Sequence, residues 1–247
     1  MTATNVSAAA KAELTSTGKL RAGINFQNVL LTTLGPNGEQ GGVAVEFARE
    51  LARRLGVELE IVPYQSAGAL GDSWNSGVWD ICVLAEEAER AKVIEFATPL
   101  TQIEATYVVP AGSSIRSIDE VDRPGVRIAV AEKSGYELYL SRTLKNAQLV
   151  KVAGIKAAEE RFVSDKLEAL AGLKPQLLEL APKIAGARII DGHFTEVRHT
   201  VGTPKGRPAA AAYLREVVED VKGSGRVAQW IEKSGVKGLS VAPAVRP

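Results

Sequence analysis

The segment Trp79–Leu100 constrains the fold of this 247-residue chain more than any other part of the sequence. It opens with an unbroken apolar run, Ile81–Leu84, which needs cover on both faces, as strands of parallel α/β sheets have. A polar stretch, Glu86–Arg90, follows this run directly. Because open α/β sheets bind small anionic ligands in the loops that follow the carboxyl ends of their strands, the segment predicts a buried strand followed by a ligand-binding loop.

Arg90 is the candidate binding residue of this loop. A guanidinium group binds a carboxylate through two parallel N–H···O bonds, which a lysine cannot reproduce. The spacing equally allows Arg90 to pair with Glu86 or Glu87 on a solvated turn, so the residues alone leave both interpretations open.

Charge and composition exclude several classes of function. The chain has 30 basic and 29 acidic residues, a net charge of +1, which gives no electrostatic case for binding nucleic acid or anionic membranes. The lone cysteine, Cys82, lies inside the apolar run and is expected to pack as a small hydrophobic residue. No apolar stretch is long enough for a membrane-spanning helix, so no membrane insertion is expected.

The first residues carry neither a basic region nor the apolar core of a secretory signal. The sequence as written therefore predicts a cytoplasmic protein, and a periplasmic one if a signal peptide has been removed.

Strand and helix patterns alternate along the chain. In the first part, the expected elements are strands at 20–24, 57–62 and 79–84 and helices at 43–55 and 67–76. Gly56 suits the end of the helix at 43–55. After a connector at 111–114 the pattern restarts, with strands at 126–131, 149–152, 167–173 and 187–190 and helices at 136–144, 155–163 and 175–181. This alternation predicts an α/β fold of two doubly wound units.

The last part of the chain is expected to be helical. A loop at 201–206 leads into helices at 209–222 and 227–234, and the tail at 236–247 lacks periodicity, so it is expected to lie on the surface or to fray.

Three motifs resemble those of the family 3 extracellular solute-binding proteins, which have the periplasmic binding protein-like type II fold and include the polar amino-acid binders. The matching positions are Gly42, Val43 and Glu46 in the first motif, Gly77, Trp79 and Asp80 in the second, and Glu89, Arg90, Phe96, Thr98 and Pro99 in the third. The resemblance spans roughly residues 18 to 235. It implies two α/β lobes joined by a two-stranded hinge near 106–110 and 191–195, with a ligand closed between them. One lobe comprises residues 1–108 and 193–247, and the other, inserted lobe comprises residues 109–192.

The resemblance also implies roles for individual residues. The arginine at position 90 binds the ligand carboxylate, and Ser134 matches a Ser or Thr that holds the same group. A helix N-terminus favours an anion, although Ser134 also suits a simple N-cap. The loop after the first strand supplies Asn25, Phe26 and Asn28, of which Phe26 also suits the core. The remaining ligand candidates are Leu84, Glu86 and Tyr136, with Tyr107 a weaker one near the hinge.

Two departures from the family pattern bear on the ligand. Amino-acid binders carry an acidic residue for the ligand's α-ammonium after the strand that here ends in Leu173 and Lys174. Their polar loop Ser-Gly-Met-Thr is replaced by Leu84–Glu87. A buried ammonium without a partner costs about 3 kcal/mol. We therefore expect a carboxylate compound bridged by Arg90 and Lys174, unless Lys174 is a surface lysine or Glu86 or Glu87 takes the ammonium.

The expected partners are a small carboxylate ligand and, for a transport role, an ABC permease, with the protein acting as a monomer. No cofactor or metal motif is present; Gly202–Gly206 resembles only half of a phosphate loop. Two alternatives remain: a soluble sensor that closes on its ligand, and an enzyme of the same fold resembling the cyclohexadienyl dehydratases. The enzyme would need a carboxylic acid or a histidine in the cleft. Of the two histidines, His199 falls beyond the second hinge crossing, and His193 could face the cleft, although a surface position is favoured for it.

Overall fold

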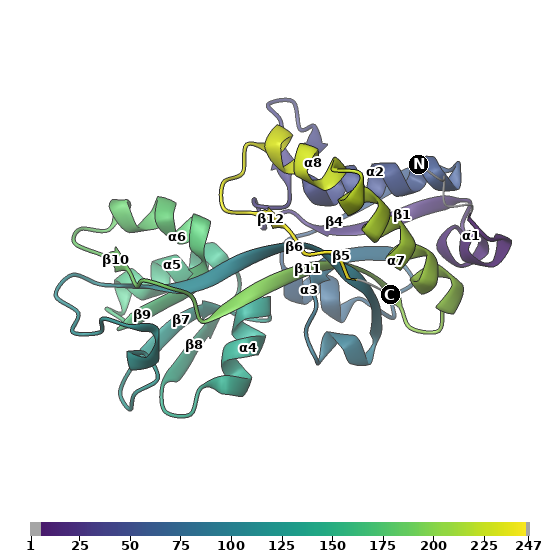
Figure 1. The fold of residues 1–247 in the computed structure, drawn as a ribbon. Coiled ribbons are helices and arrows are strands. Elements are labelled where there is room, and N and C mark those ends of the chain that lie inside the picture. Colours follow the sequence, from purple (N-terminus) through teal and green to yellow (C-terminus); the bar gives the residue numbers. More distant parts are fainter. Residues whose placement is uncertain (1–5, 246–247) are drawn as a thin grey trace. The chain divides into compact units, whose positions relative to one another are not determined.

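The computed structural model describes residues 6–245, which form two compact units. Unit 1 comprises Met1–Gln102 and Arg198–Pro247, and unit 2 comprises Ile103–Val197. The chain passes from one unit to the other within two strands, β6 (Ile94–Val109) and β11 (Thr195–Pro204) (Figure 1). The lobe boundaries predicted from the sequence stay predictions.

The sheet of unit 1 has the strand order β4-β1-β5-β11. Strand β1 (Lys19–Asn25) runs parallel to both β4 (Glu58–Tyr64) and β5 (Ile81–Ala85), and β11 runs antiparallel to β5. A small hairpin, β2 (Thr33–Leu34) and β3 (Gln40–Gly41), follows the loop after β1. The first predicted strand, the buried run and the predicted doubly wound α/β pattern are thereby confirmed.

Except for α1, the helices of unit 1 follow the apolar periodicity of the sequence. They are α1 (Ala8–Leu14), α2 (Val43–Leu55), α3 (Ala67–Asp72), α7 (Pro208–Gly223) and α8 (Arg226–Ser234), with a 3₁₀ turn, η1 (Arg90–Lys92). Helix α2 has the predicted bounds because two glycines delimit it. Gly42 has φ +90°, and a Cβ atom there would lie 2.5 Å from the Leu31 carbonyl oxygen. Gly56 ends the helix in the left-handed conformation at φ +66°.

Unit 2 has its own sheet and core. Strand β9 (Ala169–Leu173) pairs antiparallel with the second half of β6 and parallel with β7 (Arg127–Ala131), which pairs parallel with β8 (Gln148–Val152). The short β10 (Arg188–Ile189) pairs with β6. The helices are α4 (Gly135–Thr143), α5 (Ile155–Ser164) and α6 (Lys174–Leu180), with 3₁₀ turns η2 (Ile118–Glu120) and η3 (Ala181–Lys183). Phe162, Leu170 and Leu177 lie in a buried cluster beside this sheet.

Four segments differ from the sequence-based expectation. The helix expected at 67–76 ends at Asp72. The loop predicted at 201–206 is strand as far as Pro204, because Val201 and Gly202 pair with Val83 and Cys82 of β5. The tail forms a short strand, β12 (Ser240–Val241), paired with β6. Helix α1 was not predicted. Its stability comes from long-range contact rather than periodicity, since it packs against α7.

Candidate functional site

Polar side chains gather where the parallel strands of each unit end. In unit 1, the carboxyl ends of β1 and β5 meet the middle of the antiparallel β11 at one edge of the sheet, because His199 of β11 pairs with Ala85 at the end of β5. In unit 2, the ends of the neighbouring parallel strands β7 and β9 lead directly into α4 and α6. These edges are the ligand-binding positions of open α/β sheets.

Arg90 lies at this edge of unit 1 and is buried, with 7% of its surface exposed. Its Nη1 donates a hydrogen bond to the Ala85 carbonyl oxygen at 3.0 Å, and its Nη2 donates to the Ala67 carbonyl oxygen at 3.4 Å. Its Nε lies 3.3 Å from where a Cβ atom on Gly71 of α3 would be, so the guanidinium packs closely on this helix. The residue is therefore held in one orientation by β5 and α3 and is not a cation on a solvated turn.

His199 is buried beside this cation. Its Nε2 lies 3.2 Å from Nδ2 of Asn28, whose Oδ1 accepts from the Leu30 backbone at 3.3 Å. Since the amide nitrogen of Asn28 donates, Nε2 accepts, and the proton of the neutral ring is on Nδ1. Burial, together with the charge of Arg90, lowers the pKa of His199 to about 4. The ring is thus neutral near pH 7, and its Nδ1 has no hydrogen-bond partner among residues 6–245.

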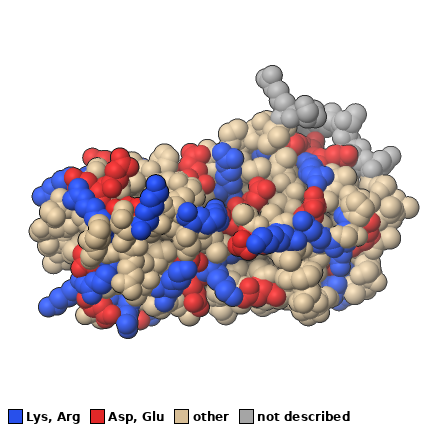
Figure 2. All heavy atoms as spheres, turned by 90° about the horizontal axis from the view of Figure 1, so that it is seen from below, with Lys and Arg blue, Asp and Glu red and all other residues tan. Residues whose placement is uncertain are grey.

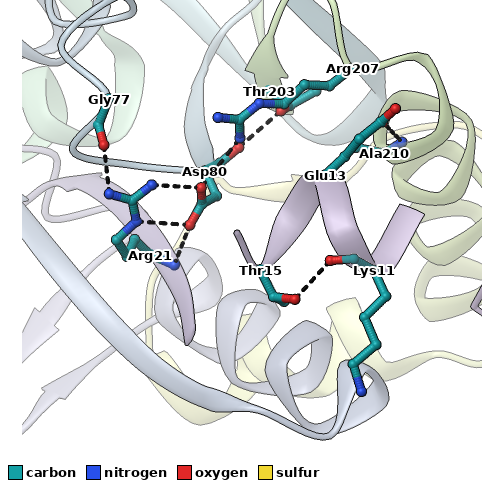
Figure 3. Close-up of polar contacts among 9 residues, drawn as sticks. All are labelled: Lys11, Glu13, Thr15, Arg21, Gly77, Asp80, Thr203, Arg207 and Ala210. Atoms are coloured by element: carbon teal, nitrogen blue, oxygen red, sulfur yellow. Dashed lines mark hydrogen bonds and ion pairs between the residues drawn. The ribbon is translucent and has the colours of Figure 1, made fainter. Parts of the chain in front are cut away.

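The Trp-Asp motif has a structural role in unit 1. The Asp80 carboxylate is fully buried and accepts from Nε of Arg21 at 3.0 Å and from Nη2 at 2.8 Å, as Figure 3 shows. Arg207, which precedes α7, donates to the same carboxylate at 3.3 Å. Thr203 of β11 donates to the Asp80 carbonyl oxygen. Asp80 therefore ties β1, β11 and the start of α7 together at the end of the sheet away from Arg90.

Figure 3 also shows how α1 is attached. A carboxylate oxygen of Glu13 accepts a hydrogen bond from the Ala210 backbone nitrogen at 2.7 Å. This nitrogen is in the first turn of α7, where backbone N–H groups have no partner within the helix.

The other residues predicted in unit 1 lie in different surroundings. Asn25 and Phe26 are half-buried after β1, and the Asn25 side chain accepts from the Gln27 backbone nitrogen. Glu86 is exposed, and its backbone nitrogen donates to the carbonyl oxygen of Arg198 on β11. The Leu84 side chain is in the core cluster with Leu70 and Trp79.

Ser134 and Tyr136 are at the start of α4 in unit 2. Ser134 is the N-cap, and its Oγ accepts from the Glu137 backbone nitrogen at 3.1 Å. Tyr136 is buried, which raises the pKa of its hydroxyl to about 12, and it forms a hydrogen bond with the Ser134 side chain. Ser134 is thus a cap, as one interpretation predicted, and it also presents a hydroxyl group at the positive end of the helix.

Lys174 is at the start of α6, and its ammonium is hydrogen-bonded to the carboxylate of Glu104 on β6. His193 Nδ1 lies 3.4 Å from the other oxygen of the same carboxylate. The hydrogen bond from Lys174 is the main reason that the pKa of Glu104 is lowered. The cation proposed to bridge a ligand therefore already has an anionic partner within unit 2.

The sequence reasoning missed two residues, His199 as a neighbour of Arg90 and Glu104 as the partner of Lys174. Neither belongs to a motif, and both act through partners far away in the chain. One available signal is the position of each on a long strand that passes from one unit to the other.

The surface and the helices add two observations. On the face that Figure 2 shows, acidic and basic side chains are interspersed, in keeping with the net charge of +1. Among residues 6–245, no helix is both long and apolar enough to cross a membrane, and no three His, Cys, Asp or Glu side chains are grouped to hold a metal ion.

The fold and the site define a class, the ligand-binding proteins. Both α/β units have polar side chains at the ends of their strands, and in unit 1 one of these side chains is a buried arginine. Comparison with known proteins gives the family. Residues 20–236 match the model of the bacterial extracellular solute-binding proteins, family 3. The chain belongs to this family and is a solute-binding protein, as the motifs predicted.

Individual relatives are distant. The L-cystine-binding protein TcyJ of Escherichia coli K12 is 23% identical over 87% of this chain and 82% of its own length. A solute receptor for L-cysteine of Neisseria gonorrhoeae has a similar structure, with a TM-score of 0.78 and 20% identity over 92% of this chain and 95% of its own. An ancestral amino acid-binding protein, AncCDT-1, described as a precursor of cyclohexadienyl dehydratase, has a TM-score of 0.74 and 22% identity, over 90% of this chain and 97% of its own. The structural likenesses show the fold alone.

Proposed function

We propose that this protein binds a small carboxylate-bearing solute and that Arg90 binds the carboxylate. The observation that carries the proposal is the orientation of Arg90, whose guanidinium is fixed by the carbonyl oxygens of Ala85 and Ala67 at the carboxyl end of β5. A guanidinium stays charged at any physiological pH, and its interaction with an anion is stronger in a buried site than in water. Because the group is already ordered, little side-chain entropy is lost when a ligand binds.

In unit 2, we propose that Ser134 and the N-terminus of α4 assist in binding the same anionic group. The Ser134 hydroxyl and the first backbone N–H groups of the helix favour negative charge. Asn25, Phe26, Asn28, Glu86 and Tyr136 remain candidates for further contacts with the solute. Leu84 remains a candidate only through its backbone, because its side chain is in the core.

The pair formed by Lys174 and Glu104 bears on which carboxylates are preferred. A ligand ammonium would compete with Lys174 for the Glu104 carboxylate, and a displaced Lys174 would repel it. This supports a preference for carboxylates that lack an α-ammonium. The names of the relatives, which refer to cystine, cysteine and amino acids, support an amino-acid-like scaffold of similar size.

Calorimetry with Arg90→Lys tests the carboxylate site. Native mass spectrometry of the purified protein is used first, to look for a bound solute. The probes then titrated are 3-phenylpropionate, succinate, L-cystine and L-arginine. For a probe that binds, we expect Arg90→Lys to weaken affinity by about 100-fold, because a lysine cannot make two parallel bonds. The control is Arg215→Lys in α7, an exposed arginine paired with Glu95, which should leave affinity unchanged. Affinity retained within about threefold in Arg90→Lys would contradict the assignment.

We further propose that the protein delivers its solute to an ABC permease, acts as a monomer and does not catalyse a reaction. The description of the family as extracellular supports a location outside the cytoplasmic membrane over the cytoplasmic one expected from the sequence as written. Fractionation of native cells tests the location, and light scattering tests the monomer.

The name of the ancestral relative favours one enzymatic alternative, a dehydratase, and loss of prephenate on incubation with the protein would support it.

A further inference from the structure

A groove of about 390 Å³ lies between α2 and α8 in unit 1, apart from Arg90 and the strand ends. Three arginines line it, Arg49 and Arg53 of α2 and Arg226 of α8, together with Glu46, Glu50, Gln229 and Trp230. None of these side chains has a role in the proposed carboxylate site.

Arg53 and Arg226 contact one buried carboxylate, that of Glu50, whereas Arg49 pairs with Glu46 at 3.0 Å. Glu50 accepts two hydrogen bonds from Arg53, both at 2.9 Å, and one from Nε of Arg54 at 2.7 Å. Arg226 lies 2.5 Å from the same carboxylate. These cations and hydrogen bonds outweigh burial and lower the pKa of Glu50 to about 2, so it stays ionised and holds the arginines in place.

The three guanidinium groups have more donors than their partners in the groove use. Each has five N–H groups. Within residues 6–245, hydrogen bonds and ion pairs use two of these groups on Arg49, two on Arg53 and one on Arg226. All three side chains are more than a third exposed, so their remaining donors can reach a binding partner.

The spacing of these cations favours an extended chain with repeated negative charges. Arg49 and Arg53 are four residues apart on one face of α2, a rise of about 6 Å along the helix. Alternate side chains of an extended peptide are spaced by about 6.6 Å, so two carboxylates on one face of such a segment match the two arginines. Trp230, half-buried beside them, adds the aromatic contact that is frequent, with arginine, at the centres of protein interfaces.

We propose that this groove is a docking site for an acidic segment of a partner protein. The inference rests on the proposed function in one respect: the expected partner is the permease. A single small anion fits less well, because the point at which Arg53 and Arg226 converge already holds the Glu50 carboxylate, and Arg49 pairs with Glu46 instead.

Gln229 allows a test that does not disturb the ion pairs of Glu50. It lines the groove and is exposed. Gln229→Glu adds a negative charge to the groove and Gln229→Lys a positive one. The matched control is Gln148→Glu on β8 of unit 2, which is also exposed. The probe is a labelled, end-capped peptide of alternating glutamate and serine, titrated at low salt by fluorescence anisotropy, with a glutamine and serine peptide and inorganic phosphate as comparison probes.

We expect the acidic peptide to bind, Gln229→Glu to weaken it by about threefold to tenfold, and Gln229→Lys to strengthen it by a similar factor. The control should bind like the wild type. The proposal is overturned if the acidic peptide does not bind, if the neutral peptide binds as tightly, if the Gln229 variants match the control, or if phosphate binds and the peptide does not. Calorimetry of the Gln229 variants with a carboxylate that binds the wild type should give unchanged affinity. The peptide titration needs no solute, so its result can be interpreted even if the carboxylate assignment fails.

Discussion

The side chains of Asn28 and His199 are hydrogen-bonded at 3.2 Å, although 171 positions separate them in the sequence. This contact joins the loop after β1 to β11, next to the residue that we propose binds the ligand. It fixes the proton of the neutral His199 ring on Nδ1, and the charge of Arg90 helps to keep the ring neutral.

The burial of His199 makes the stability of the protein depend on pH. Its pKa is about 4 in the folded protein and 6.5 in the reference state, so between these values the unfolded chain binds more protons than the folded one. The free energy of unfolding therefore decreases as the pH falls from about 7 to about 4, by about 3 kcal/mol from this residue.

Urea unfolding of the wild type and of His199→Gln across this pH range measures the contribution. Glutamine keeps an acceptor for Asn28 but does not titrate. We expect a shallower decrease in stability for the variant than for the wild type. Parallel curves for the two proteins would show that His199 is not the group responsible.

The Asp80 carboxylate is expected to stabilise unit 1 strongly. Asp80→Asn removes the negative charge that two arginines share, and loss of one member of a buried ion pair costs about 3 kcal/mol or more. The control is Glu58→Gln, because Glu58 pairs with Lys19 at 3.6 Å across the neighbouring strands β1 and β4 with both side chains exposed. Such a pair contributes less than about 1 kcal/mol. Urea unfolding of both variants checks the difference, and equal losses would refute the structural role of Asp80.

Lys174→Met is expected to change ligand preference. Without the lysine, the Glu104 carboxylate becomes available to a ligand ammonium, in the role of the acidic residue that the sequence lacks. L-Phenylalanine and 3-phenylpropionate differ only in the α-ammonium, so the ratio of their affinities isolates it. We expect this ratio to shift toward the amino acid by about tenfold.

Lys156→Met is the control for this change, since Lys156 is an exposed lysine of unit 2 that faces Glu160 at 3.9 Å. Calorimetry gives the two affinities. The two solutes share the scaffold that binds and differ only in the α-ammonium. An unchanged ratio in Lys174→Met would mean that Lys174 does not select against an ammonium.

The sequence by itself determined the α/β class, the bounds of α2, the buried strand β5 and the family. These features depend on signals that are local in the chain, such as the apolar spacing over Val43–Leu55, the glycine at 56 and the run Ile81–Leu84. Helical and strand periodicity fix which face of an element is buried, so they can be read without knowing its neighbours.

Only the tertiary structure decided which polar groups meet. The contacts of His199 with Asn28, of Lys174 with Glu104 and of Asp80 with Arg21 join residues 171, 70 and 59 positions apart. A charged side chain has the same sequence signature whether it faces water, a ligand or an opposite charge. Its role depends on the strand order, and the strand order depends on packing energies summed over the whole sheet.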